Sequence, residues 1–213
     1  MSLTDWRRSK LSQHHIVELF YFSMIDNLES LLQYGILPKN EMIKRGLSHA
    51  SFAEESVQDR RHIREIELSN HTKATIHDLV PLYLVPRTPT LSARRAYQNK
   101  IFFIVINSDI VADEKTEFSF SDGNAASQET RFFNSLYKLK HLPWDVLKAD
   151  YWNDFSDGKR KRNAEFLIFP SVPPKYFIRI IILNPNLQNH CKMLVQKFGS
   201  SIDVIVDSSY FFI

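Results

Sequence analysis

Short apolar runs rich in β-branched and aromatic residues recur along the chain and dominate its C-terminal half. Runs of this length and composition predict strands, and none approaches the roughly 18 apolar residues of a membrane-spanning helix. The predicted strands cover residues 17–24, 80–86, 100–107, 164–170, 175–183, 201–207 and 209–213. Prolines near both ends of the 80–86 run confine that strand to a sheet edge or a short pairing. We therefore expect an α+β domain with a mixed or antiparallel sheet.

Helical signals are fewer and lie toward the front of the chain. Within residues 25–35, Asp26 is placed to cap the start of a helix, leucines repeat at helical spacing, and Gly35 is placed to end it. A second helix is expected over residues 127–139. Residues 38–78 are charged and weakly periodic, which indicates a long irregular segment with one helical turn near Glu54 to Arg61.

The composition excludes several classes of protein. A length of 213 residues with 44% hydrophobic residues suits one packed domain spanning residues 1–213. The single cysteine, Cys191, excludes an internal disulfide and a thiolate metal centre, and no metal site is expected. The N-terminus lacks the apolar segment of a signal peptide, so we expect a cytoplasmic protein with no membrane partner. Because the net charge is only +3, a nucleic-acid role requires local clusters of cations.

Four consecutive cations, Lys159, Arg160, Lys161 and Arg162, shortly precede Glu165 at the start of a predicted strand. In one interpretation these charges form a solvated surface on which Glu165 pairs with its neighbours, which is the commoner arrangement. In the other, the cations hold a polyanionic substrate while the carboxylate stabilises a transition state with oxocarbenium character. The charge pattern alone leaves both interpretations open.

A second basic segment, residues 57–64, contains Arg60, Arg61 and Arg64. A guanidinium binds phosphate oxygens in a bidentate manner, so one of these arginines can clamp a diphosphate. The competing interpretation is a solvated helix with Arg60 and Arg64 on one face, and the sequence alone somewhat favours it.

Two further segments carry candidate binding residues. Tyr83 lies in the middle of a predicted strand, where its ring either stacks on a flat ligand or packs in the core, and Arg87 lies two pleats further along. The turn SDGNAAS at residues 121–127 offers backbone N–H groups to a phosphate if a helix follows it. The glycine-rich motifs of Rossmann and P-loop nucleotide sites are absent, so side chains would have to bind phosphates.

The order of these segments resembles one known family, the DarT toxins, which are ADP-ribosyltransferases that use NAD to modify bases in single-stranded DNA. Five blocks carry the resemblance: FYFSMIDNLESLLQYGIL at 20–37, VQDRR at 57–61, HDLVPLYLVPRTP at 77–89, SDGNAAS at 121–127 and KRNAEFL at 161–167. Five blocks in the family order are far more specific than any one of them. They favour the functional interpretation of both basic segments.

The resemblance implies a compact ADP-ribosyltransferase fold, in which two small mixed or antiparallel sheets with flanking helices form a cleft for NAD. It implies that Glu165 is the catalytic glutamate, and that Arg60 or Arg61 contacts the NAD phosphates and assists the reaction. The residues implied for NAD binding are Tyr21, Ser23, Asn27, Gly35 and Tyr83, with Tyr21 and Ser23 replacing a histidine and a threonine of the family. Those implied for nucleic-acid binding are His77, Arg87, Ser121, Asn124, Ser127, Lys159, Arg160, Lys161 and Arg162.

The implied activity is transfer of ADP-ribose from NAD to a thymidine or guanosine base of single-stranded DNA, with release of nicotinamide. A single strand is expected because a base must leave the stack to enter an active site. The resemblance also implies an antitoxin partner with a macrodomain that removes the modification. Two other functions fit the basic segments: nucleic-acid binding without catalysis, and ADP-ribosylation of RNA or protein.

Overall fold

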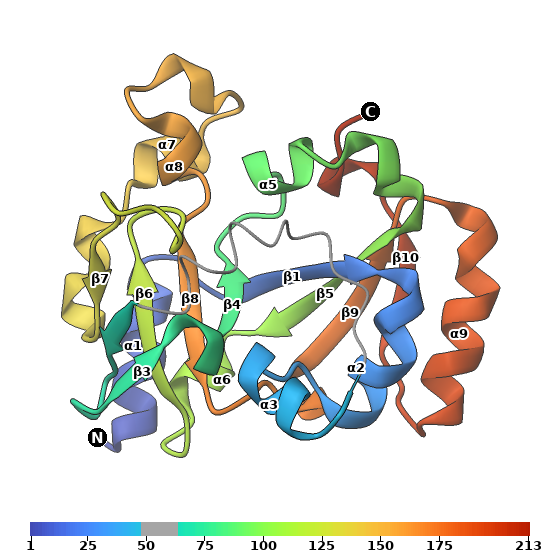
Figure 1. Ribbon diagram of the computed structural model, residues 1–213, viewed down its shortest axis with the longest axis horizontal. Helices are drawn as coiled ribbons and strands as arrows, with labels where there is room; N and C mark the ends of the chain where they lie inside the picture. Colours follow the sequence, from blue (N-terminus) through green and yellow to red (C-terminus); the bar gives the residue numbers. More distant parts are fainter. Residues whose placement is uncertain (48–63) are drawn as a thin grey trace.

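The computed structural model describes residues 1–47 and 64–213. Its strands form an eight-stranded sheet in the order β10-β9-β5-β1-β4-β8-β6-β7 and a separate two-stranded sheet, β2-β3 (Figure 1). The strands are β1 (Glu18–Met24), β2 (Glu65–Glu67), β3 (Lys73–Thr75), β4 (Val80–Tyr83), β5 (Ile101–Asn107), β6 (Glu117–Ser121), β7 (Phe132–Phe133), β8 (Glu165–Phe169), β9 (Phe177–Ile182) and β10 (Asp203–Val206).

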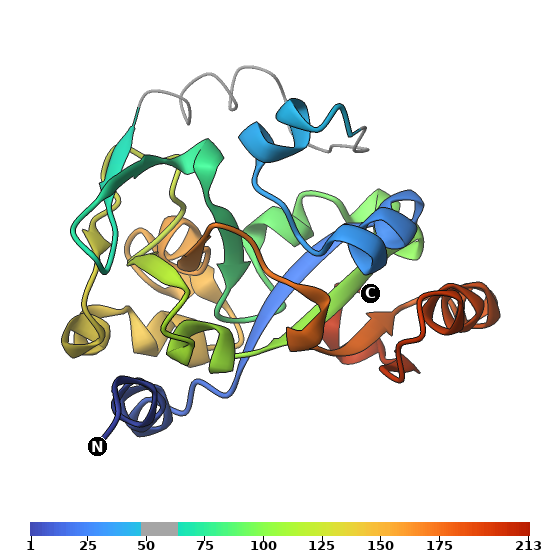
Figure 2. The same ribbon diagram turned by 90° about the horizontal axis from the view of Figure 1, so that it is seen from below.

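Helices within the described residues are short, apart from one near each end of the chain. The α-helices are α1 (Leu3–Gln13), α2 (Leu28–Tyr34), α3 (Lys39–Lys44), α5 (Pro89–Ser92), α6 (Asp109–Ala112), α7 (Trp144–Lys148), α8 (Gly158–Lys161) and α9 (Gln188–Lys197). The 3-10 turns are η1 (Ile25–Asn27), η2 (Ile76–Asp78), η3 (Arg95–Lys100), η4 (Leu136–His141), η5 (Trp152–Asp154), η6 (Pro174–Tyr176), η7 (Pro185–Leu187) and η8 (Ser208–Tyr210). In both views α1 and α9 lie at opposite ends of the molecule (Figures 1 and 2).

A single residue pair joins the two halves of the large sheet. β1 pairs along its whole length with β5, whereas it meets β4 only where Phe20 lies opposite Tyr83. Beyond this pair, which we call the sheet junction, β1 and β4 diverge (Figure 1). The two small sheets expected from the sequence are therefore two halves of one sheet, β10-β9-β5-β1 and β4-β8-β6-β7. The sheet is mixed because β9 and β10 run parallel.

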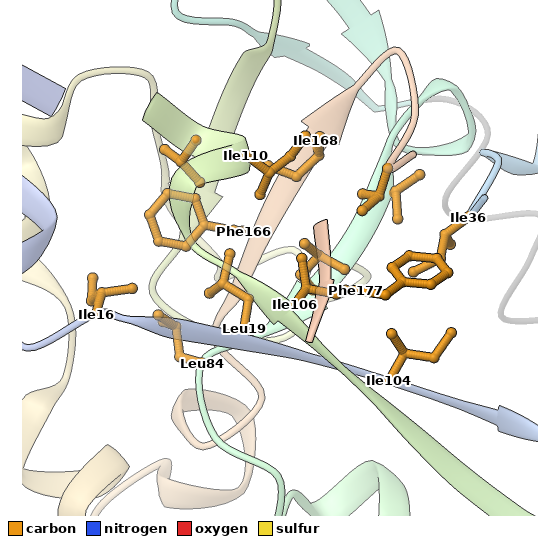
Figure 3. Close-up of a cluster of buried hydrophobic side chains, with 14 of the residues drawn as sticks. Ile16, Leu19, Ile36, Leu84, Ile104, Ile106, Ile110, Phe166, Ile168 and Phe177 are labelled. Atoms are coloured by element: carbon orange, nitrogen blue, oxygen red, sulfur yellow. The ribbon is translucent and has the colours of Figure 1, made fainter. Parts of the chain in front are cut away.

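Apolar layers cover both faces of the large sheet. One face carries Leu19, Ile104 and Phe166, and it packs against α1, α2, α6 and α9 (Figure 3). On the other face Phe103 packs with α5 and residues near the end of the sequence, and the β2-β3 sheet covers Leu167. Because successive side chains of a strand point to opposite faces, burial on both faces determines the register of every central strand.

Local backbone conformation determines which residues begin and end α2. A 3-10 turn, η1, precedes the helix, so Asn27 rather than the expected Asp26 is its N-cap residue. Gly35 ends it as expected, with a φ of 77° that L side chains rarely adopt. A Cβ at this position would lie 2.5 Å from the carbonyl oxygen of Val172, because the chain passes close to the β8–β9 connection there.

The helix expected over residues 127–139 is not formed. Phe132 and Phe133 instead make the two-residue strand β7, which pairs with the end of β6, and η4 follows. The aromatic pair has the β-propensity for this pairing, and tertiary pairing overrides the helical spacing of the apolar residues. The helical turn expected near Glu54 to Arg61 lies outside the described residues.

The end of the sequence also differs from expectation. Residues 209–213 do not form a strand, because the backbone N–H and C=O of Phe212 are both paired by the Gln98 side chain at 2.8 Å. Helix α9 was not expected from the sequence, and it lies between the last two strands and buries Cys191 and Val195. Burial raises the pKa of the Cys191 thiol to about 11, which agrees with a structural thiol.

Candidate active site

Glu165 begins β8, one strand away from the sheet junction. It lies opposite Tyr83, which itself lies opposite Phe20. The residue is 1% exposed, and its backbone N–H donates to Ser121 Oγ at 3.2 Å. Ser121 Oγ in turn donates to the carbonyl oxygen of Gly123 at 2.7 Å. The carboxylate predicted to be catalytic is thus buried where the two halves of the sheet separate, on a backbone held by β6.

Aromatic rings lie on the same face of the sheet as this carboxylate. Residues directly opposite each other on neighbouring strands point to the same face, so the side chains of Phe20, Tyr83 and Glu165 share one. The Tyr83 ring stacks on Phe22 with a centroid distance of 5.6 Å and an interplanar angle of 12°. The half-buried Tyr83 therefore uses part of its ring for packing within the protein, while remaining next to Glu165 along the sheet.

The polar residues predicted for NAD binding gather where β1 leaves β4. Asn27 Nδ2 donates to Ser23 Oγ at 2.9 Å, and both side chains are buried. Tyr21 directly follows the junction residue Phe20, and burial raises the pKa of its phenol to about 12. Its hydroxyl is therefore neutral at physiological pH and can donate a hydrogen bond. Gly35 lies at the end of α2, where only its backbone is available for a ligand.

A hydrogen bond connects the two sheet halves on the side where β1 and β4 diverge. Asn40 Nδ2, on α3, donates to Asp78 Oδ1, on η2, at 2.6 Å. α3 follows β1 and α2 in the chain, whereas η2 leads directly into β4. His77 lies in the same turn and is 6% exposed, so its burial opposes the prediction that it contacts nucleic acid.

The four cations before Glu165 have different environments. Lys159 is exposed, and Lys161 is half-buried with its Nζ donating to the carbonyl oxygen of Ser156 at 2.8 Å. Arg160 forms ion pairs with Asp122 and Asp157. Because these ion pairs neutralise its charge, they oppose the prediction that Arg160 binds nucleic acid.

Arg162 has a structural environment. It is 7% exposed, and its guanidinium donates to the carbonyl oxygens of Arg87, Val146, Leu147 and Ala149 at 2.7–3.0 Å. These contacts hold α7 and the β4–α5 connection against the start of β8. The prediction that Arg162 binds nucleic acid is opposed by the same contacts, because its Nε and Nη1 donate to carbonyl oxygens within the protein.

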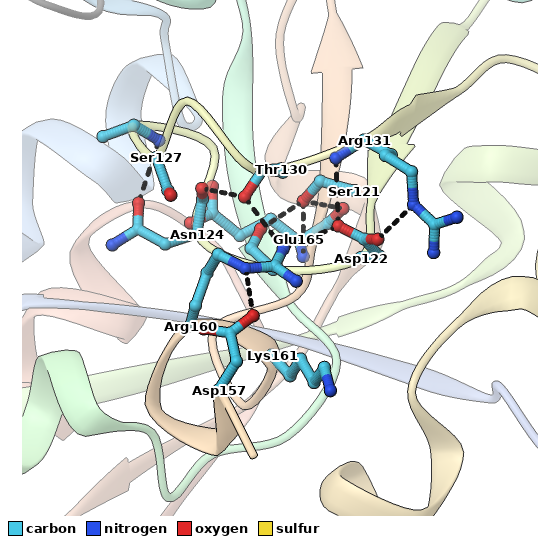
Figure 4. A network of polar contacts seen from close by, with 12 residues as sticks. Ser121, Asp122, Asn124, Ser127, Thr130, Arg131, Asp157, Arg160, Lys161 and Glu165 are labelled. Carbon is cyan, nitrogen blue, oxygen red and sulfur yellow. Dashed lines mark hydrogen bonds and ion pairs between the residues drawn. The ribbon is translucent and has the colours of Figure 1, made fainter.

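The loop after β6, predicted to contact nucleic acid, is tightly folded on itself (Figure 4). Ser121 is fully buried, so its side chain is not on an accessible surface. Asn124 Oδ1 accepts from the backbone of Ala126 at 2.9 Å, and the carbonyl oxygen of Ser127 accepts from the Arg64 guanidinium. These hydrogen bonds therefore fix the backbone of the loop, and its polar side chains do not form an exposed row. Asp122, the first residue of this loop, was not singled out from the sequence.

Exposed basic residues lie around α5 and on α8, two helices at the same edge of the molecule (Figure 1). Arg87 and Arg95 are exposed, and their guanidinium carbons lie 4.8 and 5.2 Å from the ring centroid of Phe212. Trp152 packs edge-on against the same ring. Only Arg87 was predicted, because the contribution of Arg95 depends on a contact between distant parts of the chain.

The arginine pair Arg60 and Arg61 lies outside the described residues. Arg64, from the same basic segment, donates to the carbonyl oxygens of Ser127 and Thr130 and lies 4.5 Å from the ring centroid of Phe132. Within residues 1–47 and 64–213, no cluster of three or more His, Cys, Asp or Glu residues is arranged to hold a metal ion. The same residues include no helix long and apolar enough to cross a membrane.

Known proteins resemble this chain over most of its length. A family model described as "ssDNA thymidine ADP-ribosyltransferase, DarT" matches residues 20–212. A DNA ADP-ribosyl transferase of Thermus sp. (strain 2.9) is 26% identical over 188 residues, which are 84% of this chain and 88% of that protein. A DNA ADP-ribosyl transferase–glycohydrolase fusion protein of Thermosipho africanus is 26% identical over 201 residues, which are 92% of this chain and 50% of the fusion.

Solved structures share the fold. Thermus sp. 2.9 DarT in complex with ADP-ribosylated ssDNA matches with a TM-score of 0.82 at 24% identity, over 92% of this chain and 96% of that chain. The same protein in complex with NAD+ matches with a TM-score of 0.77 at 22% identity, over 92% and 98% of the two chains. The expected ADP-ribosyltransferase fold is confirmed.

Proposed function

Because the chain belongs to the DarT family of single-stranded-DNA ADP-ribosyltransferases, we propose that it transfers ADP-ribose from NAD to a thymine base, with Glu165 as the catalytic carboxylate. The observation that supports this most directly is the burial of Glu165 beside the sheet junction. Water is largely excluded from the carboxylate there, so its charge acts more strongly on a nearby cationic centre than it would on the surface. Thymine follows the description of the family model.

The residues around the junction suit NAD, which is a substrate here. Tyr21, Ser23 and Asn27 supply neutral hydrogen-bonding groups that fit ribose hydroxyls and a carboxamide. We propose that the Tyr83 ring packs beside the nicotinamide end. Arg60 or Arg61 would bind the diphosphate, since the chain lacks a glycine-rich phosphate loop.

Glu165 has two tasks in the proposed reaction. The bond between nicotinamide and the ribose breaks with its electron pair leaving on nicotinamide, and the carboxylate stabilises the positive charge that develops on the ribose. A nitrogen of the base then donates an electron pair to the same ribose carbon. The carboxylate accepts the proton that this nitrogen loses.

The exposed basic residues around α5 and on α8 suit a single strand of DNA. Arg87, Arg95 and Lys159 are exposed, and they lie on the elements around α5 and α8. Phosphates of a strand bind such cations without sequence preference, while unstacked bases remain available to the active site. We propose that these three exposed cations, rather than Arg160 and Arg162, bind the phosphates of the DNA backbone.

A second protein that reverses the modification is part of the proposal. The Thermosipho relative is a fusion of a DNA ADP-ribosyl transferase with a DNA ADP-ribosyl glycohydrolase. We propose that this chain is the toxin of a toxin–antitoxin pair, with a DarG-like macrodomain glycohydrolase as the antitoxin. It would act in the cytoplasm, where NAD and single-stranded DNA are both present.

Mass spectrometry of short oligonucleotides tests the activity. Single-stranded oligonucleotides with one thymine or one guanine are incubated with NAD and either the parent protein or Glu165→Gln, which keeps the size of the side chain but removes its charge. We expect an ADP-ribose adduct on the thymine oligonucleotide with the parent alone. An adduct only on guanine would refute thymine as the target. Single-stranded RNA and protein are tested as acceptors in parallel incubations. An adduct on these acceptors alone would refute the DNA assignment.

A further inference from the structure

Asp122 is the centre of an ion-pair network next to Glu165 (Figure 4). Its Oδ1 accepts from the backbone N–H of Arg131 at 3.0 Å and from Arg160 Nη1 at 2.7 Å. Its Oδ2 accepts from Arg131 Nε at 2.8 Å. Burial raises the pKa of this carboxyl, but the hydrogen bonds from Arg131 and Arg160 outweigh the burial and hold the pKa below its usual range. Asp122 is therefore a buried anion with charged partners on two sides.

Arg160 connects the loop after β6 to α8. Its Nε pairs with Asp157 at 2.6 Å, and its Nη1 also donates to Thr130 Oγ1 at 3.1 Å. Its carbonyl oxygen accepts from the backbone N–H of Asn124 at 3.0 Å. The loop lies so close to Arg160 that a Cβ at Gly123 would be 2.5 Å from Nη1 and 2.9 Å from the backbone oxygen. The lack of space for a side chain explains why glycine follows Asp122 here.

The same contacts reach the catalytic carboxylate through the backbone. Ser121, the residue before Asp122, accepts the hydrogen bond from the N–H of Glu165. Arg160 lies on α8, which leads directly into the strand that Glu165 begins. The start of β8 is thus held to the end of β6 through Ser121, and the 122–131 loop is held to α8 by the Asp122–Arg160 ion pair, which is largely removed from water.

We propose that Asp122 is a positioning residue that, through Arg160, fixes the 122–131 loop relative to Glu165 so that a DNA base meets the carboxylate in a reactive orientation. This inference rests on the proposed function. It assigns Arg160 to the internal structure of the site rather than to the DNA backbone. A positioning role requires a fixed charge pair, because displacement of a reacting group by about 1 Å costs on the order of a hundredfold in rate.

Kinetics of three variants separate positioning from direct DNA binding. Asp122→Asn and Arg160→Gln each break the ion pair, whereas Arg131→Gln is the matched control, because Arg131 also binds Asp122 but its side chain is 70% exposed, against 12% for Arg160. We expect kcat for DNA modification to fall at least about tenfold in the first two variants, with KM for NAD within about twofold of the parent. Arg131→Gln should stay near the parent value, since exposed ion pairs contribute little.

The salt dependence of DNA affinity distinguishes a positioning role of Arg160 from a direct contact between Arg160 and DNA. If Arg160 bound a phosphate, Arg160→Gln would lower the slope of log K against log salt by about one, and Asp122→Asn would not impair binding. Under our proposal neither variant changes this slope, whereas Lys159→Gln lowers it. A lowered slope in Arg160→Gln together with parental kcat in Asp122→Asn would overturn the proposal.

Hydrogen–deuterium exchange of the loop amides tests the anchoring without reference to activity. Residues 122–131 should exchange faster in Asp122→Asn and Arg160→Gln than in the parent or in Arg131→Gln. Unchanged exchange in both variants would refute the role of Asp122. If the parent protein modified no oligonucleotide, the proposed function would fail, and the exchange rates would still decide whether Asp122 anchors the loop.

Discussion

Replacing Arg162 with methionine should destabilise the protein substantially, although the residue belongs to a basic run that looks like surface in the sequence. Methionine keeps an unbranched apolar stem but is shorter than arginine, and it removes every donor. The guanidinium of Arg162 uses the one hydrogen of Nε and the two of Nη1 to contact four backbone carbonyl oxygens. The loss is therefore three N–H donors to buried or half-buried acceptors.

The magnitude follows from these three donors. A hydrogen bond from a charged group contributes roughly 1.5–3 kcal/mol, so three contribute at least about 4.5 kcal/mol before offsets. Removing the cost of burying the charge and rehydrating the freed carbonyls offsets part of this, which leaves a loss of about 3–4 kcal/mol. For a chain of this size each kcal/mol shifts Tm by about 2–4 °C, so a decrease of roughly 6–16 °C is expected.

Urea denaturation and thermal melting without DNA measure this loss, with Lys159→Met as the matched control. Lys159 lies in the same basic run but is exposed, so its replacement should change stability by less than about 0.5 kcal/mol. Arg162→Lys should fall between the two, because an ammonium keeps the charge but cannot span the same carbonyls. A stability loss below about 1 kcal/mol in Arg162→Met, accompanied by weaker DNA binding, would refute the structural assignment.

Three further outcomes are expected. Gly35→Ala should lower Tm more than Gly46→Ala, because both glycines have positive φ but only Gly35 has a backbone oxygen, that of Val172, within 2.5 Å of an added Cβ; equal Tm values would contradict the close approach. The lowered pKa of Asp122 means that its contribution to stability is present above the unfolded value of about 3.9 and is lost as pH falls through the folded-state pKa. Acid titration of the free energy of unfolding should therefore be less steep for Asp122→Asn than for the parent, and identical curves would show that the charge contributes nothing. The buried Cys191 thiol, with a pKa of about 11, should resist an aromatic disulfide reagent at pH 8 in the folded protein and react fully in denaturant, and rapid reaction without denaturant would contradict its burial.

Local sequence was sufficient to predict the elements for which the apolar pattern and the residues at the ends indicate the same helix or strand. Six of the seven expected strands form, and α2 ends at Gly35 as its positive φ requires. Helix α9 was missed because only Cys191 and Val195 are buried along it, so its apolar face is narrow. The helix expected over 127–139 failed because Phe132 and Phe133 complete the sheet edge, and their pairing partners Ser121 and Phe120, which lie 11 and 13 residues away, are not visible in a local window.

The sequence by itself determined the family, the catalytic candidate Glu165 and the strands that carry it, because these depend on residue types in a fixed order. Only the tertiary structure decided whether each neighbouring cation is exposed or held inside the protein. Four cations that are equivalent in the sequence become one exposed lysine, one half-buried lysine and two arginines held inside the protein. The physical reason is that the energy of a charge depends on its solvation and on partners such as Asp122, which lie far away in the chain and adjoin it only after folding.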